Sequence, residues 1–139
     1  MKSKKLRAWL MLIFWMGIIF LLSHQPNSGQ ATYNVIENIF VNIKINSIIS
    51  AINFIIRKFA HLTEYFILAF LTVSLLKEYT KKQIIIFVVT LFFCFSYAVT
   101  DEFHQLYVIG RTGSIKDIFI DTTGSIIYLL IYVIRKIKK

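Results

Sequence analysis

The sequence predicts an all-α membrane protein: a four-helix transmembrane bundle formed by one domain, residues 1–139, with both termini in the cytoplasm. Hydrophobic residues make up 57% of the chain and charged residues 17%, whereas soluble domains average about 45–50% and about 25%. The apolar residues fall into four runs, each close to the about 20 residues that a membrane-spanning helix needs. Basic residues gather at alternate ends of these runs, and this distribution is typical of membrane proteins, where it sets the orientation of the spans.

The first span is expected at residues 8–23, directly after a basic N-terminal stretch. A secretory signal peptide has a similar pattern. The residues at the end of the run, Ser23-His24-Gln25-Pro26, contain no small-x-small cleavage site. We therefore expect this span to be retained, with cleavage as the alternative, and we expect Pro26 to end the helix.

Residues 31–56 mix isoleucines with asparagines and serines. The isoleucines recur at helical spacing, which is typical of a helix with one apolar face. Such a helix can lie in the plane of the membrane interface. We therefore predict an amphipathic interfacial segment between the first and second spans.

Three further spans are expected at residues 59–76, 83–100 and 117–134. The loop at 77–82 and the two termini then lie on one side of the membrane and hold most of the 16 basic residues. By the positive-inside rule this side is the cytoplasm. We expect no nucleic-acid partner, because the net charge of +9 is placed at span ends and forms no basic face of a soluble fold.

The polar residues that interrupt the spans share one side of the membrane. Under this topology they reach the outer leaflet, where ionisable groups are costly and are usually paired and functional. Residues three or four apart share a helix face, so Arg57, His61 and Glu64 form one stripe, and Asp117 and Asp121 form another. The sequence therefore predicts one polar site at the outer face.

Two chemistries fit such a site, and the first is a divalent metal. Carboxylates and histidine could hold a metal that activates water or binds a phosphate, although no compact ligand motif such as His-Glu-x-x-His is present. The residues leave open whether the chain is an enzyme and which cofactor it uses. The candidate metal ligands, which are also the candidate catalytic acids and bases, are Asp101, Glu102, His104, Asp117 and Asp121.

The second chemistry is recognition of an anion, since guanidinium groups match the geometry of phosphate and carboxylate. A phospholipid headgroup or a lipid-linked cell-wall precursor would supply such an anion. The candidate binding residues are Ser23, Gln25, Arg57, Lys58, His61, Glu64, Tyr65, Gln105 and Arg111.

The same charges also have a structural interpretation. An aspartate such as Asp101 or Asp117 can pair with an arginine only to neutralise buried charge, and Lys58 can extend to the headgroups. The protein would then be a non-catalytic structural or regulatory membrane protein whose polar cluster stabilises helix packing. A channel is disfavoured, because the polar residues gather at one end of the spans and do not line a path.

Five motifs run through nearly the whole chain. They are Ser23-x-Gln25-Pro26, Arg57-Lys58-x-Ala60-His61-x-x-Glu64-Tyr65, Tyr97-Ala98-x-x-Asp101-Glu102-x-His104-Gln105, Gly110-Arg111, and Asp117-x-x-x-Asp121-x-x-Gly124. In this order they resemble the VanZ-like family of small membrane proteins, with Ile109 standing where a proline is expected.

This resemblance implies a multi-pass protein of the bacterial cytoplasmic membrane, and thus of the cell envelope. It also implies an association with low-level resistance to the glycopeptide antibiotic teicoplanin. The partners expected from the site and the resemblance together are membrane lipids, an anionic lipid headgroup, a lipid-linked precursor or the glycopeptide itself. The resemblance implies no settled reaction.

Overall fold

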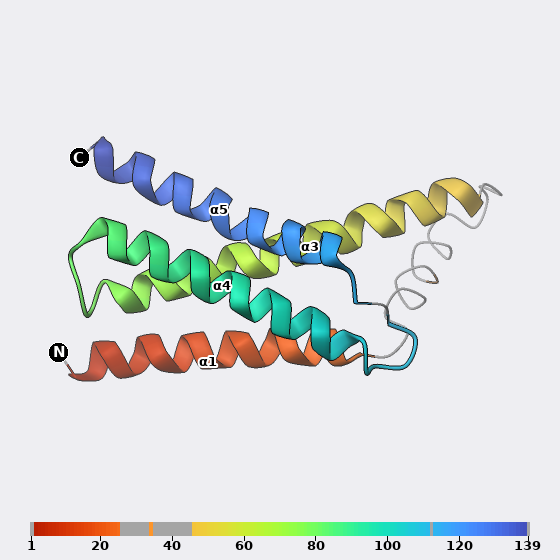
Figure 1. Ribbon diagram of the computed structural model, residues 1–139, viewed down its shortest axis with the longest axis horizontal. Coiled ribbons are helices and arrows are strands. Elements are labelled where there is room, and N and C mark those ends of the chain that lie inside the picture. The colour runs from red at the N-terminus through yellow and green to blue at the C-terminus, as the bar shows by residue number, and fades with distance from the viewer. Residues whose placement is uncertain (1, 26–33, 35–45, 112, 139) are drawn as a thin grey trace.

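The computed structural model describes residues 2–25, 34, 46–111 and 113–138. Within these residues it is a bundle of four long helices (Figure 1). Each helix is long and apolar enough to cross a membrane, which confirms the predicted all-α four-helix membrane fold. The helices are α1 (Lys2–His24), α3 (Asn46–Leu76), α4 (Gln83–Gln105) and α5 (Ile115–Ile137).

The second span begins earlier than the sequence predicted. α3 starts at Asn46 instead of near Phe59, because no glycine or proline interrupts this stretch. Residues 46–56 of the predicted interfacial segment are therefore the first part of α3, which corrects the prediction of a separate segment there. Residues 31–45 of that segment lie outside the described part of the chain, apart from Asn34.

The two ends of the bundle differ in charge. Both termini and the turn at 77–82 lie at one end (Figure 1), which we call the basic end. The sequence predicted this sorting, and the assignment of the basic end to the cytoplasm stays a prediction. The basic end carries Lys2, Lys4, Lys5, Lys77, Lys81, Lys82, Arg135, Lys136 and Lys138.

The opposite end, which we call the site end, is built from all four helices. It comprises the last turns of α1 and α4, the loop after α4, the first turns of α5, and residues 57–65 of α3. α3 extends past the other helices at this end (Figure 1). The helix order therefore brings together the polar residues that interrupt the apolar runs.

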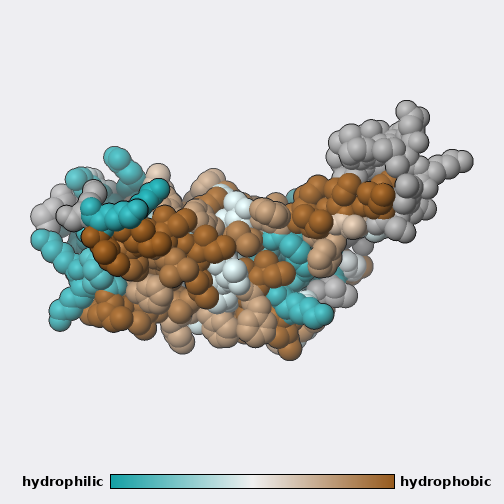
Figure 2. All heavy atoms as spheres, turned by 90° about the horizontal axis from the view of Figure 1, so that it is seen from above, coloured by the Kyte–Doolittle hydropathy of each residue, from teal (hydrophilic) through white to brown (hydrophobic). Residues whose placement is uncertain are grey.

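α3 packs against α1, α4 and α5, and its most extensive contact is with α5. Its buried residues Tyr65, Leu68 and Ala69 join a hydrophobic cluster with Cys94 and Ala98 of α4. Large apolar side chains also cover the outside of the bundle. Figure 2 shows them as a largely brown and tan surface over the middle of the molecule, with teal at the basic end and a smaller teal patch toward the site end. In a membrane, such a surface contacts lipid tails.

The closest approach of α3 and α5 is set by a glycine. A Cβ atom added at Gly124 would collide with the backbone carbonyl of Leu62, so only glycine allows this crossing. The next residue, Ser125, donates a hydrogen bond to the carbonyl oxygen of Tyr65 at 3.3 Å. One turn nearer the site end, the same crossing places His61 beside Asp121.

Candidate functional site

The site end has a buried polar interior. Eight of the side chains that the sequence singled out are removed from solvent there, although ionisable groups are rarely buried without partners. Their partners therefore define what the site can do. The buried candidates are Tyr65 and seven more polar residues: Ser23, His61, Asp101, Glu102, Gln105, Asp117 and Asp121.

Asp101 joins α1 to α4. Its Oδ2 atom accepts hydrogen bonds from Ser23 Oγ at 2.8 Å and from Gln105 Nε2 at 3.1 Å. Asp101 and Gln105 are one helical turn apart on α4, so they share a face. Ser23 and the end of α4, which the sequence predicted to lie together, are therefore in direct contact. Both groups that donate to Asp101 are neutral.

Glu102 faces α5 and is held by the loop after α4. The backbone N–H of Ser114 donates to Glu102 Oε2 at 2.7 Å, and Gln105 Nε2 donates to Oε1 at 3.3 Å. The loop folds back tightly, since a Cβ atom at Gly113 would meet the Glu102 carbonyl oxygen. These contacts fix the direction of the Glu102 carboxylate.

His61 and Asp121 join α3 to α5. His61 Nδ1 lies 3.1 Å from Asp121 Oδ1, and Asp121 is fully buried. The second carboxylate oxygen, Oδ2, is buried without a hydrogen-bond partner among the described residues. One turn nearer the end of the bundle, Lys58 and Asp117 form an ion pair between the same helices.

His61, Glu102 and Asp121 form a compact triad of possible metal ligands. Each offers one ligand atom, and these atoms lie within 4.8 Å of one another. Nitrogen and carboxylate oxygen are ligands that divalent metals accept. The structure therefore brings Glu102 and Asp121 of the predicted metal set together with His61, which the sequence had placed among the binding residues.

The other three members of the predicted metal set have different partners. Asp101 bonds to Ser23 as described above, and Asp117 pairs with Lys58. His104 lies at the surface of the site end, where its Nε2 atom is 3.1 Å from Nδ1 of His24. The two imidazole rings also stack, with centroids 5.3 Å apart.

His24 was counted from the sequence among the polar groups at the outer face, but it was not included among the candidate site residues. The available signal was its position: His24 and His104 both occupy the last turn of a span on the same side of the membrane. The amide of Ser114 was also missed, and no sequence signal reveals which backbone N–H faces a carboxylate.

An arginine-lined pocket opens beside the triad. Its cavity volume is about 170 Å³. The pocket draws its walls from α1, α3 and the loop after α4, and His61 forms part of its lining, so the pocket leads toward the triad. The lining residues are Leu22, Gln25, Arg57, Ala60, His61, Glu64 and Arg111.

Arg111 fastens the loop to the C-terminal end of α1. Its guanidinium donates to the carbonyl oxygens of Leu22 at 2.5 Å and Gln25 at 3.2 Å, and to Gln105 Oε1 at 3.5 Å. The last carbonyls of a helix lack partners within the helix and carry partial negative charge. Arg111 is therefore a helix cap, and all three of its acceptors are neutral.

Arg57 lies near Arg111 in this pocket. Burial, and then the charge of Arg57, lower the pKa of the Arg111 guanidinium, although an arginine stays protonated in proteins. Arg57 makes no hydrogen bond or ion pair within the described part of the chain, and neither arginine has a carboxylate at ion-pair distance there. Two neighbouring guanidinium groups without such a partner favour an anion between them.

Four of the predicted binding residues do not line this pocket, namely Ser23, Lys58, Tyr65 and Gln105. Ser23 and Gln105 both donate to Asp101 instead. Tyr65 is fully buried in the hydrophobic core, where its ring lies 6.3 Å from that of Tyr97. Lys58 is used in its ion pair with Asp117 and lines a different surface cavity. The pocket therefore includes only some of the anion-binding residues that the sequence proposed.

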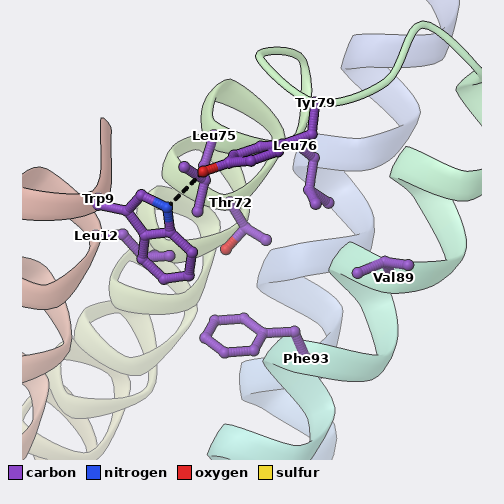
Figure 3. A pocket seen from close by; sticks show the side chains of 8 residues that line it. All are labelled: Trp9, Leu12, Thr72, Leu75, Leu76, Tyr79, Val89 and Phe93. Carbon is purple, nitrogen blue, oxygen red and sulfur yellow. Dashed lines mark hydrogen bonds between the residues drawn. The ribbon is translucent and has the colours of Figure 1, made fainter. Parts of the chain in front are cut away.

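A second cavity, near the basic end, has a different character. It measures about 300 Å³ and lies among α1, α3 and α4, with the rings of Trp9 and Phe93 along its walls (Figure 3). Trp9 Nε1 donates to Tyr79 Oη at 2.9 Å across its mouth. The lining carries no charged side chain. A Trp–Tyr pair at this place is typical of the membrane–water interface.

Comparison with known protein families gives a match. The family model described as VanZ/LLP1 matches residues 8–136, which is nearly the whole chain and includes every candidate residue named above. No curated protein and no solved structure matches the chain.

Proposed function

This chain belongs to the VanZ/LLP1 family, and from this premise we propose that it binds an anionic phosphate group at the pocket of Arg57 and Arg111. The ligand is the headgroup of an anionic lipid or of a lipid-linked cell-wall precursor. The site end then faces the outside of the bacterial cytoplasmic membrane, with the basic end in the cytoplasm. The role that such binding serves is low-level teicoplanin resistance.

The observation that carries this proposal is the pair of arginines. Arg57 has no described partner, and Arg111 bonds only to neutral acceptors, so the pocket holds two positive charges with free donor groups. A planar guanidinium can bind two phosphate oxygens at once. Basic pockets between membrane-spanning helices are known to bind lipid headgroups.

The pocket also lies at a suitable depth. It includes Leu22 and Gln25 at the end of α1, so it falls where this span meets the headgroups. A lipid could therefore reach the two arginines with its phosphate while its acyl or prenyl chain stays in the membrane. Glu64, which also lines the pocket, would favour a ligand that offers a hydroxyl or amine beside the phosphate.

The test is a binding titration with purified protein in detergent, using phosphatidylglycerol and a polyprenyl phosphate as probes and zwitterionic phosphatidylcholine as the reference lipid. Arg57→Gln should weaken both anionic probes about 10- to 100-fold, the equivalent of about 1.5–3 kcal/mol for hydrogen bonds to a charged group. Lys116→Gln removes an exposed charge from the same end and should change binding little. Equal binding by the two variants would contradict the proposal.

A second candidate function, a purely structural polar cluster, is favoured by two contacts. Ser23 with Asp101 links α1 to α4, and Lys58 with Asp117 links α3 to α5. If the polar cluster serves only to hold the helices together, Asp101→Asn should lower folded yield and teicoplanin resistance together. Under the binding proposal, Arg57→Gln stays folded and loses resistance, measured as the inhibitory concentration of teicoplanin in a strain that depends on this protein.

A further inference from the structure

One buried oxygen at the site end has no partner. Asp121 is 0% exposed, its Oδ1 atom faces His61, and its Oδ2 atom makes no hydrogen bond with any residue that the structure describes. Leaving such an acceptor unsatisfied costs free energy, and more so when it carries charge. A ligand that supplies positive charge at Oδ2 would remove this cost.

The charges around Asp121 also favour a positively charged ligand. Four carboxylates are buried at this end, yet within the described residues only Asp117 has a lysine or arginine at ion-pair distance. Asp101 and Glu102 are held by neutral donors, namely Ser23, Gln105 and a backbone amide. A divalent cation would balance the excess negative charge.

From these observations we infer that His61, Glu102 and Asp121 bind one divalent metal ion. Their ligand atoms lie within 4.8 Å of one another, so small side-chain rotations bring them onto one ion. One imidazole with two carboxylates suits Zn²⁺ or Mn²⁺, whereas Ca²⁺ prefers oxygen ligands alone. Asp121 contributes Oδ2, its otherwise unpaired oxygen.

The surroundings of the triad are those of a metal site. Gln105 and the amide of Ser114 hold the Glu102 carboxylate from behind, as outer-shell groups orient metal ligands. Three protein ligands leave one position of a four-coordinate metal free. His61 also lines the arginine-lined pocket, so the triad and the pocket are neighbours. The inference goes beyond the proposed anion binding and does not require it.

Metal binding to the full-length protein in detergent tests this inference without any lipid. The protein is stripped with a chelator and titrated with Zn²⁺ and with Mn²⁺, and bound metal is measured by elemental mass spectrometry. Wild type should bind one ion per chain. Asp121→Asn and Glu102→Gln should each lose more than about 100-fold in affinity, since changes to outer-shell partners alone cost about 10–100-fold.

The matched control is Asp117→Asn, which also removes a buried carboxylate from α5 but lies outside the triad. It should keep the ion, and circular dichroism should show that all three variants remain helical. Visible absorption of bound Co²⁺ gives a second readout, with bands in wild type and Asp117→Asn that are absent from Asp121→Asn. Wild type without metal, or equal loss in Asp117→Asn, would overturn the inference.

The same samples separate this inference from the proposed function. Loss of lipid binding in Arg57→Gln tests the anion pocket, and loss of metal in Asp121→Asn tests the triad. Wild-type protein that binds metal but no anionic lipid contradicts only the proposed function. Wild-type protein that binds anionic lipid but no metal contradicts only the metal site, and the buried carboxyls are then neutralised by protons.

Discussion

His61 on α3 and Asp121 on α5 are 60 positions apart in the sequence, yet Nδ1 of His61 lies 3.1 Å from Oδ1 of Asp121. This contact depends on the backbones of the two helices coming unusually close at Gly124 and Leu62. The helix crossing and the polar site are therefore one feature: any change that separates α3 from α5 also separates His61 from Asp121.

The first prediction concerns this crossing. Gly124→Ala places a Cβ atom against the carbonyl oxygen of Leu62, so it should lower the free energy of unfolding by about 1–3 kcal/mol, as overpacking does. The control is Gly17→Ala on α1, where an added Cβ meets nothing within 4 Å. It should be neutral or stabilising by about 0.5–1 kcal/mol. Unfolding by dodecyl sulfate in mixed micelles, followed by circular dichroism, measures both.

The second prediction concerns the link between α1 and α4. Ser23→Ala removes the 2.8 Å hydrogen bond to the buried Asp101 and should cost about 1–3 kcal/mol, because a buried acceptor loses a donor. Ser74→Ala removes a hydroxyl that bonds only within α3, to the carbonyl of Phe70 at 2.8 Å, and should cost less than half as much. If both variants lose the same free energy of unfolding in this assay, the Ser23–Asp101 hydrogen bond stabilises the fold no more than a bond within one helix, which contradicts the prediction.

The third prediction concerns Arg111 as the cap of α1. Arg111→Lys keeps the charge but cannot reach the Leu22 and Gln25 carbonyls and Gln105 together, because lysine lacks the planar fork of donors. The last turn of α1 should then exchange its amide hydrogens about fivefold faster for each hydrogen bond lost, given about 1 kcal/mol per bond. Hydrogen exchange with mass spectrometry reads this out. Unchanged exchange would mean that the cap does not hold the helix end.

The fourth prediction concerns membrane orientation. Lys116 is exposed at the site end and Lys81 at the basic end, whereas Cys94, the chain's one cysteine, is buried. In a Cys94→Ala background, Lys116→Cys should react with a membrane-impermeant maleimide added to intact cells, and Lys81→Cys should react only after lysis. The reverse pattern would place the site end in the cytoplasm and remove the link to the outer surface.

Much of the fold followed from the sequence, because each span needs only a run of apolar residues of sufficient length. The gathering of polar groups at one end also followed from the sequence. Successive spans run in opposite directions, so polar residues at the end of one span and at the start of the next lie on the same side. The start of α3 at Asn46 did not follow. An isoleucine pattern at helical spacing fits an interfacial helix and the beginning of a span equally well, so the pattern alone does not decide between them.

The pairing inside the site was harder to predict. Arg57, His61 and Tyr65 fall at steps of four residues, but each such step turns about 40° beyond a full helical turn. Tyr65 has therefore rotated by about 80° from Arg57, which carries it from the pocket into the core. Which acid meets His61 depends on the crossing at Gly124, and sequence spacing along single helices does not contain that information.

The measurement that tests the binding account most directly is native mass spectrometry of protein released gently from bacterial membranes with its own lipids. Wild type and Lys116→Gln should each carry an anionic phosphate-containing lipid that Arg57→Gln, although still folded, has lost. The same lipid retained equally by Arg57→Gln would contradict the account, because the two arginines would then not form the site that holds the anion.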